Sequence, residues 1–124
     1  MKRTIQSPSF SYKNDNSLKI LKVEITPDET VLYMSNNNKA DGGYYSWVTI
    51  SPNTSLVSNS RKYKLQYTYG IEISPNVTYY KYQDETINFE LHFPPIPINA
   101  ISIDFMENIE TPEDGWYIKG IQLN

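Results

Sequence analysis

The fold is decided by residues 86–105, which read TINFELHFPPIPINAISIDF. Large apolar residues alternate with polar ones on both sides of the prolines, at Ile87, Phe89, Leu91 and Phe93 and again at Ile101, Ile103 and Phe105. This period of two places the large side chains of each half on one face and predicts two half-buried strands. The prolines remove backbone donors and fix φ, so the residues between the strands are expected to form a crossover instead of a tight hairpin.

Length and composition limit the classes of protein that the chain can belong to. Its 124 residues suit one domain that buries about two-thirds of its unfolded surface. Since there is no Cys, disulfides and thiolate metal sites are excluded, and we expect no metal and no cofactor. The formal net charge of -3, without clustered Lys or Arg, argues against a nucleic-acid partner.

Two further features concern membranes and export. No run approaches the ~18 apolar residues of a spanning helix, so we expect no membrane span. Met1, Lys2 and Arg3 are followed by a polar segment and not by the apolar stretch of a signal peptide. The compartment is therefore either the cytoplasm or the destination of an exported protein whose leader has been removed.

Shorter alternating runs predict the remaining strands. We expect a frayed segment at residues 1–7, an edge strand at 8–13, and a strand at 18–26 whose apolar phase shifts near Ile20 and Leu21, which predicts a bulge. Residues 30–34 are apolar in both phases, as in a strand covered on two sides. Further strands are expected at 44–51, 62–69 and 116–123, with loops at 35–43, 70–84 and 107–115 and a change of phase at Gly120.

This pattern predicts an all-β protein, an antiparallel two-sheet sandwich of immunoglobulin-like type with seven to nine short strands in a single domain over residues 1–124. A small barrel is the alternative, because periodicity does not reveal closure. The core should contain Phe89, Leu91, Ile103, Phe105 and Trp47.

The residues that could carry chemistry do not form a recognisable active site. His92 is the single His, and it shares a polar strand face with Glu90 while Asp104 lies on a strand that could be near. The sequence offers no adjacent nucleophile in a strained turn, and alternation predicts that this face meets water, so we do not expect an enzyme. The acidic residues of the loop 107–115 lack a spaced calcium-binding pattern and are expected to form a solvated turn.

The aromatic excess is the strongest functional signal. The chain has 11 Tyr, more than a core of this size can hold, because each buries 150 to 250 Å² when it is covered. Alternation assigns Tyr67 and Tyr69 to the core with Tyr63 and Leu65. The residues left for a surface binding platform are Tyr44, Tyr79, Tyr80 and Tyr82. Exposed aromatics of this kind hold either another protein or a sugar ring, and at this point we favour the protein.

Several motifs resemble a known family. They are FELHFPPIP at residues 89–97, ISIDFME at 101–107, GWYIKGIQL at 115–123, PSF at 8–10, VEIT at 23–26 and TVL at 30–32, with Trp47 in the aromatic strand. Together they resemble the uncharacterised sandwich domain of exported Bacteroidetes proteins, which often precedes a thioredoxin-like domain. The resemblance spans Pro8 to Leu123 and rests on core and turn residues, so it implies a fold and a context but carries no active site.

These observations lead to one functional expectation and one alternative. We expect a non-catalytic accessory domain that recognises a protein partner or a neighbouring domain through exposed aromatics. The alternative is a carbohydrate-binding module that uses surface Tyr and Trp. The resemblance implies a location in the periplasm or at the cell surface.

Overall fold

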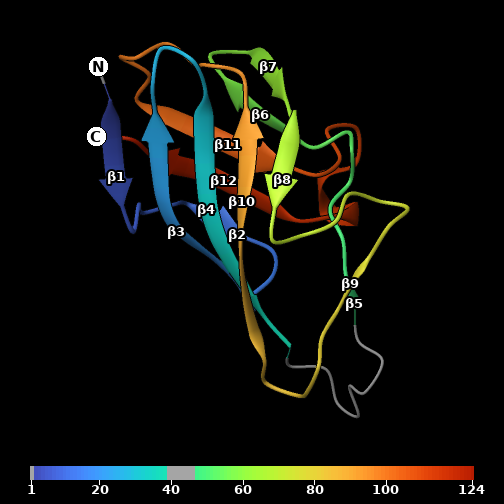
Figure 1. Ribbon diagram of the computed structural model, residues 1–124. Helices are drawn as coiled ribbons and strands as arrows, with labels where there is room; N and C mark the ends of the chain where they lie inside the picture. Colours follow the sequence, from blue (N-terminus) through green and yellow to red (C-terminus); the bar gives the residue numbers. More distant parts are fainter. Residues whose placement is uncertain (1, 39–46) are drawn as a thin grey trace.

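The computed structural model describes residues 2–38 and 47–124 (Figure 1). Among them are one single-turn 3-10 helix, η1 (Pro112–Asp114), and the following strands: β1 (Arg3–Gln6), β2 (Tyr12–Lys13), β3 (Leu18–Ile25), β4 (Thr30–Asn37), β5 (Trp47–Val48), β6 (Ser55–Ser58), β7 (Arg61–Lys64), β8 (Tyr67–Tyr69), β9 (Thr78–Tyr79), β10 (Thr86–Phe93), β11 (Ser102–Met106) and β12 (Tyr117–Gln122). In these ranges no helix has the length and apolarity needed to cross a membrane.

Two open five-stranded sheets form the two layers of the molecule (Figure 1). Sheet A has the order β1-β3-β4-β10-β8 and sheet B the order β2-β12-β11-β6-β7, and every pair within them is antiparallel. A separate two-stranded ladder joins β5 to β9. The predicted all-β antiparallel sandwich is confirmed, with more strands than expected because several of them contain only two to four residues.

The core lies between the two sheets and is formed by the alternating residues that the sequence singles out. Leu91, Phe93 and Phe105 are fully buried, and Phe89 and Ile103 nearly so. Aliphatic side chains and Met34, from both layers, complete this cluster: Leu18, Val23, Ile25, Leu32, Met34, Leu56, Ile118 and Ile121.

Trp47 does not belong to this core, contrary to the expectation. Its side chain is 55% exposed, because among the described residues β5 pairs only with β9 and lies outside both five-stranded sheets. The strand expected at 44–51 is described only from Trp47 onward. Tyr44 lies outside the described residues.

The proline-rich connection crosses from sheet A to sheet B, as predicted. It joins β10 to β11, and Ile96 in its middle is 4% exposed. The Ile96 N–H donates to Thr30 Oγ1 at 3.2 Å, and the Ala100 N–H donates to the carbonyl of Pro97 at 2.9 Å. The connection is therefore packed into the sandwich and does not project from it.

Two predicted irregularities of the ladders are confirmed. The β3–β4 register shifts between Ile20 and Lys22, which leaves Leu21 as the bulged residue. The β11–β12 register shifts between Ile103 and Phe105, opposite Gly120, whose φ of +69° favours glycine. The Gly120 N–H donates to Asp104 Oδ1 at 2.8 Å, so Asp104 serves sheet B and is not a partner of His92.

The N-terminal segment and the loop after residue 34 differ from the expectation. Residues 3–6 are not frayed, because β1 pairs with β3 from Arg3 to Gln6. The predicted loop at 35–43 begins later, since β4 extends to Asn37 and pairs there with Thr86 of β10. Cross-strand pairing outweighs the turn preference of the consecutive Asn residues at this point.

The run 62–69 forms two strands in different sheets instead of one strand. The Leu65 N–H donates to the carbonyl of Thr54 at 2.8 Å, whereas the Gln66 N–H donates to the carbonyl of His92 at 2.8 Å. The chain thus leaves sheet B and joins sheet A between adjacent residues. In sheet B, a side chain that points toward sheet A is directed into the core. Once the chain has crossed to sheet A, a side chain that points in the same direction is directed away from the core. Tyr67 and Tyr69 therefore lie on the outer surface.

Candidate functional site

The outer face of sheet A carries most of the polar and aromatic side chains that could bind a ligand. The strand registers place them in three rows across the sheet, from β3 through β4 to β10 and, for the first two rows, on to β8. The rows are Glu24, Val31, His92 and Tyr67; then Lys22, Tyr33, Glu90 and Tyr69; then Lys19, Ser35 and Asn88.

His92 is the centre of the first row. Its ring is parallel to the ring of Tyr67, with 4.4 Å between centroids and 12° between planes, and Tyr69 contacts it edge-on at 5.4 Å. Nδ1 lies 2.8 Å from Glu29 Oε1, and Nε2 lies 3.0 Å from Glu90 Oε1. The expectation that this face meets water is wrong for His92, which is 5% exposed, because Tyr67 covers its ring from β8.

Glu29 connects the His92 ring to the phenol that covers it. The Tyr67 hydroxyl donates to Glu29 Oε1 at 3.1 Å, the same oxygen that faces His92 Nδ1. Hydrogen bonding by His92 holds the pKa of Glu29 below its usual range, with a smaller contribution from Tyr67. These bonds fix β8, an edge strand, to the turn between β3 and β4.

The Tyr33 side chain in the second row is held at both its hydroxyl and its ring. The hydroxyl donates to Glu24 Oε1 at 2.7 Å, and Lys22 Nζ lies 4.4 Å from the ring centroid. Hydrogen bonding to Glu24 raises the pKa of the Tyr33 phenol, and the same bond lowers the pKa of the Glu24 carboxyl. Lys2 Nζ also contacts Glu24 Oε2 at 3.0 Å. Tyr33 is therefore a preorganised wall and not a freely rotating ring.

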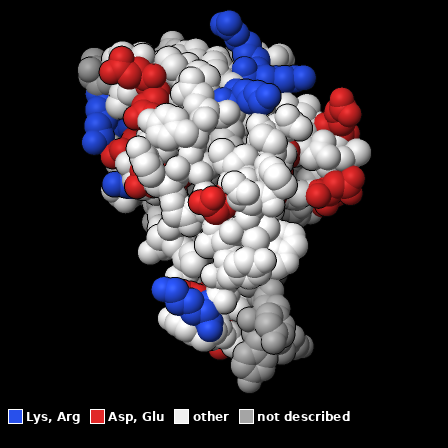
Figure 2. Space-filling view, turned by 45° about the vertical axis from the view of Figure 1, so that its right-hand side comes forward, with Lys and Arg blue, Asp and Glu red and all other residues white. Residues whose placement is uncertain are grey.

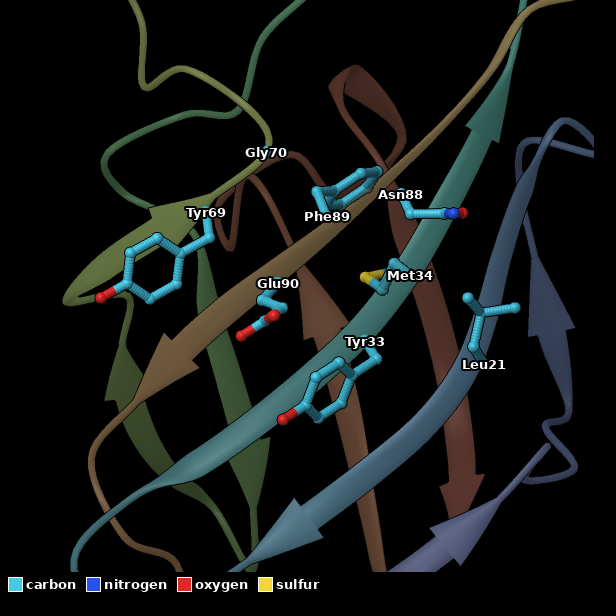
Figure 3. A pocket seen from close by; sticks show the side chains of 8 residues that line it. All are labelled: Leu21, Tyr33, Met34, Tyr69, Gly70, Asn88, Phe89 and Glu90. Carbon is cyan, nitrogen blue, oxygen red and sulfur yellow. The ribbon is translucent and has the colours of Figure 1, made fainter.

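A pocket of about 220 Å³ opens on this face between the second and third rows. Figure 3 shows Glu90 between the rings of Tyr33 and Tyr69, with Asn88 further along the same strand. Residues of β3, β4, β8 and β10, and Gly70 directly after β8, line the pocket: Leu21, Tyr33, Met34, Tyr69, Gly70, Asn88, Phe89 and Glu90.

Gly70 allows β8 to approach β10 at the edge of this pocket. Its φ is +84°, and a Cβ added there would lie 2.5 Å from the carbonyl oxygen of Asn88 and 3.1 Å from Phe89 Cα. Both atoms belong to the backbone of β10 and cannot move aside easily. The absence of a side chain at Gly70 thus sets the distance between Tyr69 and the strand that carries Asn88 and Glu90.

Two polar groups in the pocket have hydrogen-bonding capacity to spare. Glu90 uses Oε1 for His92, and within residues 2–38 and 47–124 its Oε2 accepts no hydrogen bond. The exposed Asn88 amide likewise makes no hydrogen bond to a described residue. A carboxylate oxygen and an amide, which both donates and accepts, are therefore free for a ligand beside two aromatic rings.

The rows on the outer face of sheet A contain charged residues of both signs: Lys19, Lys22, Glu24 and Glu90. Figure 2, which brings the β8 side of the molecule forward, shows Lys, Arg, Asp and Glu gathered toward the margins and mostly uncharged atoms in the middle. A ligand that docks on the outer face of sheet A therefore meets charged groups as well as aromatic and neutral polar ones.

The tyrosines expected to form a surface platform are not all available. Tyr79 and Tyr82 are 65% and 61% exposed, as predicted, but Tyr80 is 6% exposed. The Tyr80 hydroxyl donates to Asn36 Oδ1, and burial raises the pKa of its phenol to about 12. The platform expected from Tyr44, Tyr79, Tyr80 and Tyr82 therefore loses Tyr80 to the core.

Sequence reasoning missed the residues of the sheet A pocket. Tyr33 lies between the buried residues Leu32 and Met34, and strict alternation would have placed its ring on the opposite, outer face. The same alternation puts Asn88 and Glu90 on that face. Tyr69 was missed because no turn residue in the run 62–69 marks the change of sheet.

Comparison with family models, curated proteins and solved structures gave no match for this chain.

Proposed function

We propose that this protein is a non-catalytic binding module that holds a saccharide ring in the pocket on the outer face of sheet A. The observation that carries the proposal is the placement of the free Glu90 oxygen and the Asn88 amide beside the rings of Tyr33 and Tyr69 in a pocket of about 220 Å³.

The chemistry of a sugar matches these groups. A pyranose has faces of C–H groups that pack against aromatic rings, and a rim of hydroxyls that need hydrogen-bond partners when water is displaced. Glu90 Oε2 can accept from one hydroxyl, and the Asn88 amide can both donate and accept. A few fixed polar groups among apolar walls are typical of sites that bind small molecules.

The non-catalytic part of the proposal rests on how His92 is used. Both of its ring nitrogens face carboxylate oxygens, and its ring is covered by Tyr67. A general base needs a nitrogen within reach of a substrate proton. His92 instead positions Glu90 and β8.

The experiment is a glycan array followed by titration calorimetry with the strongest hit. Tyr69→Ala should weaken binding by about tenfold or more, because it removes one ring from the pocket wall. Tyr79→Ala is the matched control, since Tyr79 is 65% exposed but lies on β9, outside sheet A. Equal loss of affinity in the two variants, or an array without saturable binding, would contradict the proposal.

A second candidate is recognition of a protein partner, which is the function favoured on sequence grounds. It is supported by Trp47 and Tyr79, which are cross-strand partners in the β5–β9 ladder and are 55% and 65% exposed. Exposed Trp and Tyr are common anchors of protein interfaces. Concentration-dependent association, measured by sedimentation and lost in Trp47→Ala but kept in Tyr69→Ala, would favour this candidate.

An accessory role in an exported protein is compatible with either candidate. The support for this part is the resemblance of the motifs at residues 89–97, 101–107 and 115–123 to the sandwich domain of exported Bacteroidetes proteins. Fractionation of the native host, with detection of the protein in the periplasm or at the cell surface, tests it. Recovery only from the cytoplasm would contradict it.

A further inference from the structure

A second pocket adjoins the saccharide site along the same face of sheet A. It has a volume of about 220 Å³ and is lined by Asn16, Ser17, Lys19, Ser35, Asn37 and Thr86. The third row links the two pockets, because Ser35 pairs with Lys19 on one side and with Asn88 on the other. Asn88 lines the first pocket and Ser35 the second.

The two pockets differ in charge. The first contains the carboxylate of Glu90, whereas Lys19 is the only charged residue among the described residues that line the second. Lys19 is exposed and forms no salt bridge with any residue in the described part of the chain. An ammonium group without an ionic partner, in a pocket that no carboxylate lines, suits an anion.

A second ammonium group, that of Lys13, lies near Lys19. Burial lowers the pKa of Lys13, Asp15 raises it, and Lys19 lowers it further, so the two ammonium groups are near enough to interact. Asp15 interacts electrostatically with Lys13, its Oδ1 accepts from the Ser17 N–H and hydroxyl, and its Oδ2 accepts from Trp116 Nε1. Its oxygens are therefore already engaged within the protein.

Neutral donors accompany Lys19 in the second pocket. The Thr86 hydroxyl accepts from Asn37 Nδ2 at 2.9 Å, which leaves its own proton to donate. The exposed Asn16 amide makes no hydrogen bond to a described residue. An ammonium, an amide N–H and a hydroxyl together provide the donors that a carboxylate or a sulfate ester accepts.

The distance along the sheet suits a ligand with more than one sugar unit. From Tyr33 to Asn37 strand β4 advances about 13 Å at roughly 3.3 Å per residue. One ring in the first pocket and a linked ring in the second can follow this strand. The charges determine the orientation of the bound oligosaccharide, because an anionic substituent is repelled by Glu90 and attracted by Lys19.

We propose that the pocket around Lys19 is a second subsite, and that the ligand is an acidic oligosaccharide with a neutral ring at Tyr33 and Tyr69 and a carboxylate or sulfate at Lys19. This inference rests on the proposed saccharide function and narrows its ligand class. It assigns Lys19 as the residue that selects for charge and Tyr69 as a residue that binds any accepted sugar.

The test is an array that carries uronate-containing, sulfated and neutral oligosaccharides, with each uronate also present as its methyl ester. The strongest hits should be acidic, and methyl esterification should weaken binding about tenfold. A preference for uronates or for sulfates identifies which anion the subsite takes. Hits that are equally strong with and without the charge would overturn the second subsite and leave the proposed function intact.

Two variants separate this inference from the function on which it rests. Lys19→Gln should weaken acidic hits about tenfold and leave neutral ligands unchanged, whereas Tyr69→Ala should weaken both. Lys62→Gln is the control, because Lys62 is an exposed lysine of β7 in the other sheet. If Lys19→Gln and Lys62→Gln have the same effect, the attraction is nonspecific and the subsite is refuted. If nothing on the array binds, the saccharide function is refuted as well.

Discussion

The rings of His92 and Tyr67 stack in parallel across the β10–β8 ladder, 4.4 Å apart between centroids. Through this contact the edge strand of sheet A is attached to a buried polar group. Glu29 Oε1 accepts from the Tyr67 hydroxyl and faces His92 Nδ1, and Glu90 Oε1 faces His92 Nε2. The same cluster therefore fixes β8 and one carboxylate of the candidate pocket. Stability and ligand affinity should therefore change together when the cluster is altered.

Replacement of His92 tests this connection. His92→Phe keeps a ring for Tyr67 to stack on but removes both hydrogen bonds to carboxylates, so unfolding should become easier by about 1 to 3 kcal/mol. Urea denaturation measures the change. Tyr67→Phe, which removes only the exposed hydroxyl bond to Glu29, should destabilise the protein less than His92→Phe does. If the two variants were equally stable, the hydrogen bonds of His92 to Glu29 and Glu90 would contribute nothing to the stability of the fold.

The core alternation makes a quantitative prediction. Leu91 is fully buried, and Leu91→Ala should destabilise the protein by about 2 to 5 kcal/mol, because a cavity adds to the lost transfer free energy. Thermal and urea denaturation provide the measurement. Ile101→Ala is the control, since Ile101 is 66% exposed and should change stability by about 0.5 kcal/mol or less. A small effect at Leu91 would mean that the sheets are not packed as described.

Acid should weaken the fold partly through Glu24. The Tyr33 hydroxyl and Lys2 hold the pKa of Glu24 below its ordinary value of 4.5. As the pH falls, Glu24 is protonated in the unfolded chain at a higher pH than in the folded protein. The stability that ionised Glu24 contributes is therefore fully present above pH 4.5 and is lost as the pH falls through the pKa of Glu24 in the folded protein. Glu24→Gln should cost about 1 kcal/mol at pH 7 and less at pH 3. Urea denaturation at the two pH values measures the free-energy cost, with the exposed Glu72→Gln as control. A cost for Glu24→Gln that is the same at both pH values would contradict the role given to ionised Glu24.

Gly70 should tolerate no side chain. Gly70→Ala combines a φ of +84° with a Cβ only 2.5 Å from the Asn88 carbonyl oxygen, and should cost about 1 to 3 kcal/mol. Gly70→Asn separates the two causes, because Asn adopts positive φ more readily than Ala but still brings a Cβ. Similar losses in both variants would identify the close approach to β10 as the main constraint. Differential scanning calorimetry of both variants provides the comparison, and an unchanged melting temperature in Gly70→Ala would refute the close packing.

The sequence predicted the parts of the fold that depend on alternation and on proline. Phe89, Leu91 and Phe93 lie in the core, and the proline-rich segment forms the crossover between the sheets. Both features follow from local constraints, because apolar residues with a period of two share one strand face and proline has no backbone N–H to donate. Trp47 and Tyr80 were assigned to the wrong environments. Their burial depends on which distant strands pair, and a single sequence contains no local signal for that pairing.

The candidate site was missed for a related reason, and this reversed the preference between the two functions. Tyr67 and Tyr69 alternate correctly with their neighbours, but the chain changes sheet between Leu65 and Gln66. The alternation within the run 62–69 was therefore identified correctly, but Tyr67 and Tyr69 were assigned to the core face instead of the outer face. With Tyr69 and Tyr33 on the outer surface and Tyr80 buried, the aromatic groups gather in a pocket with Asn88 and Glu90, an arrangement that suits a sugar better than a flat protein interface.

The step between Leu65 and Gln66 also limits how the edge of sheet A that borders the candidate pocket can move. The two adjacent amides donate to opposite layers of the sandwich, Leu65 to Thr54 and Gln66 to His92. Only a short segment of chain is therefore available for β8 to separate from β10, because Leu65, two residues before the strand, is hydrogen-bonded to Thr54 on the sheet B side. Hydrogen exchange of these two amides should follow a single opening event. A ligand seated against Tyr69 would then slow solvent exchange on the opposite layer of the molecule, which it does not touch.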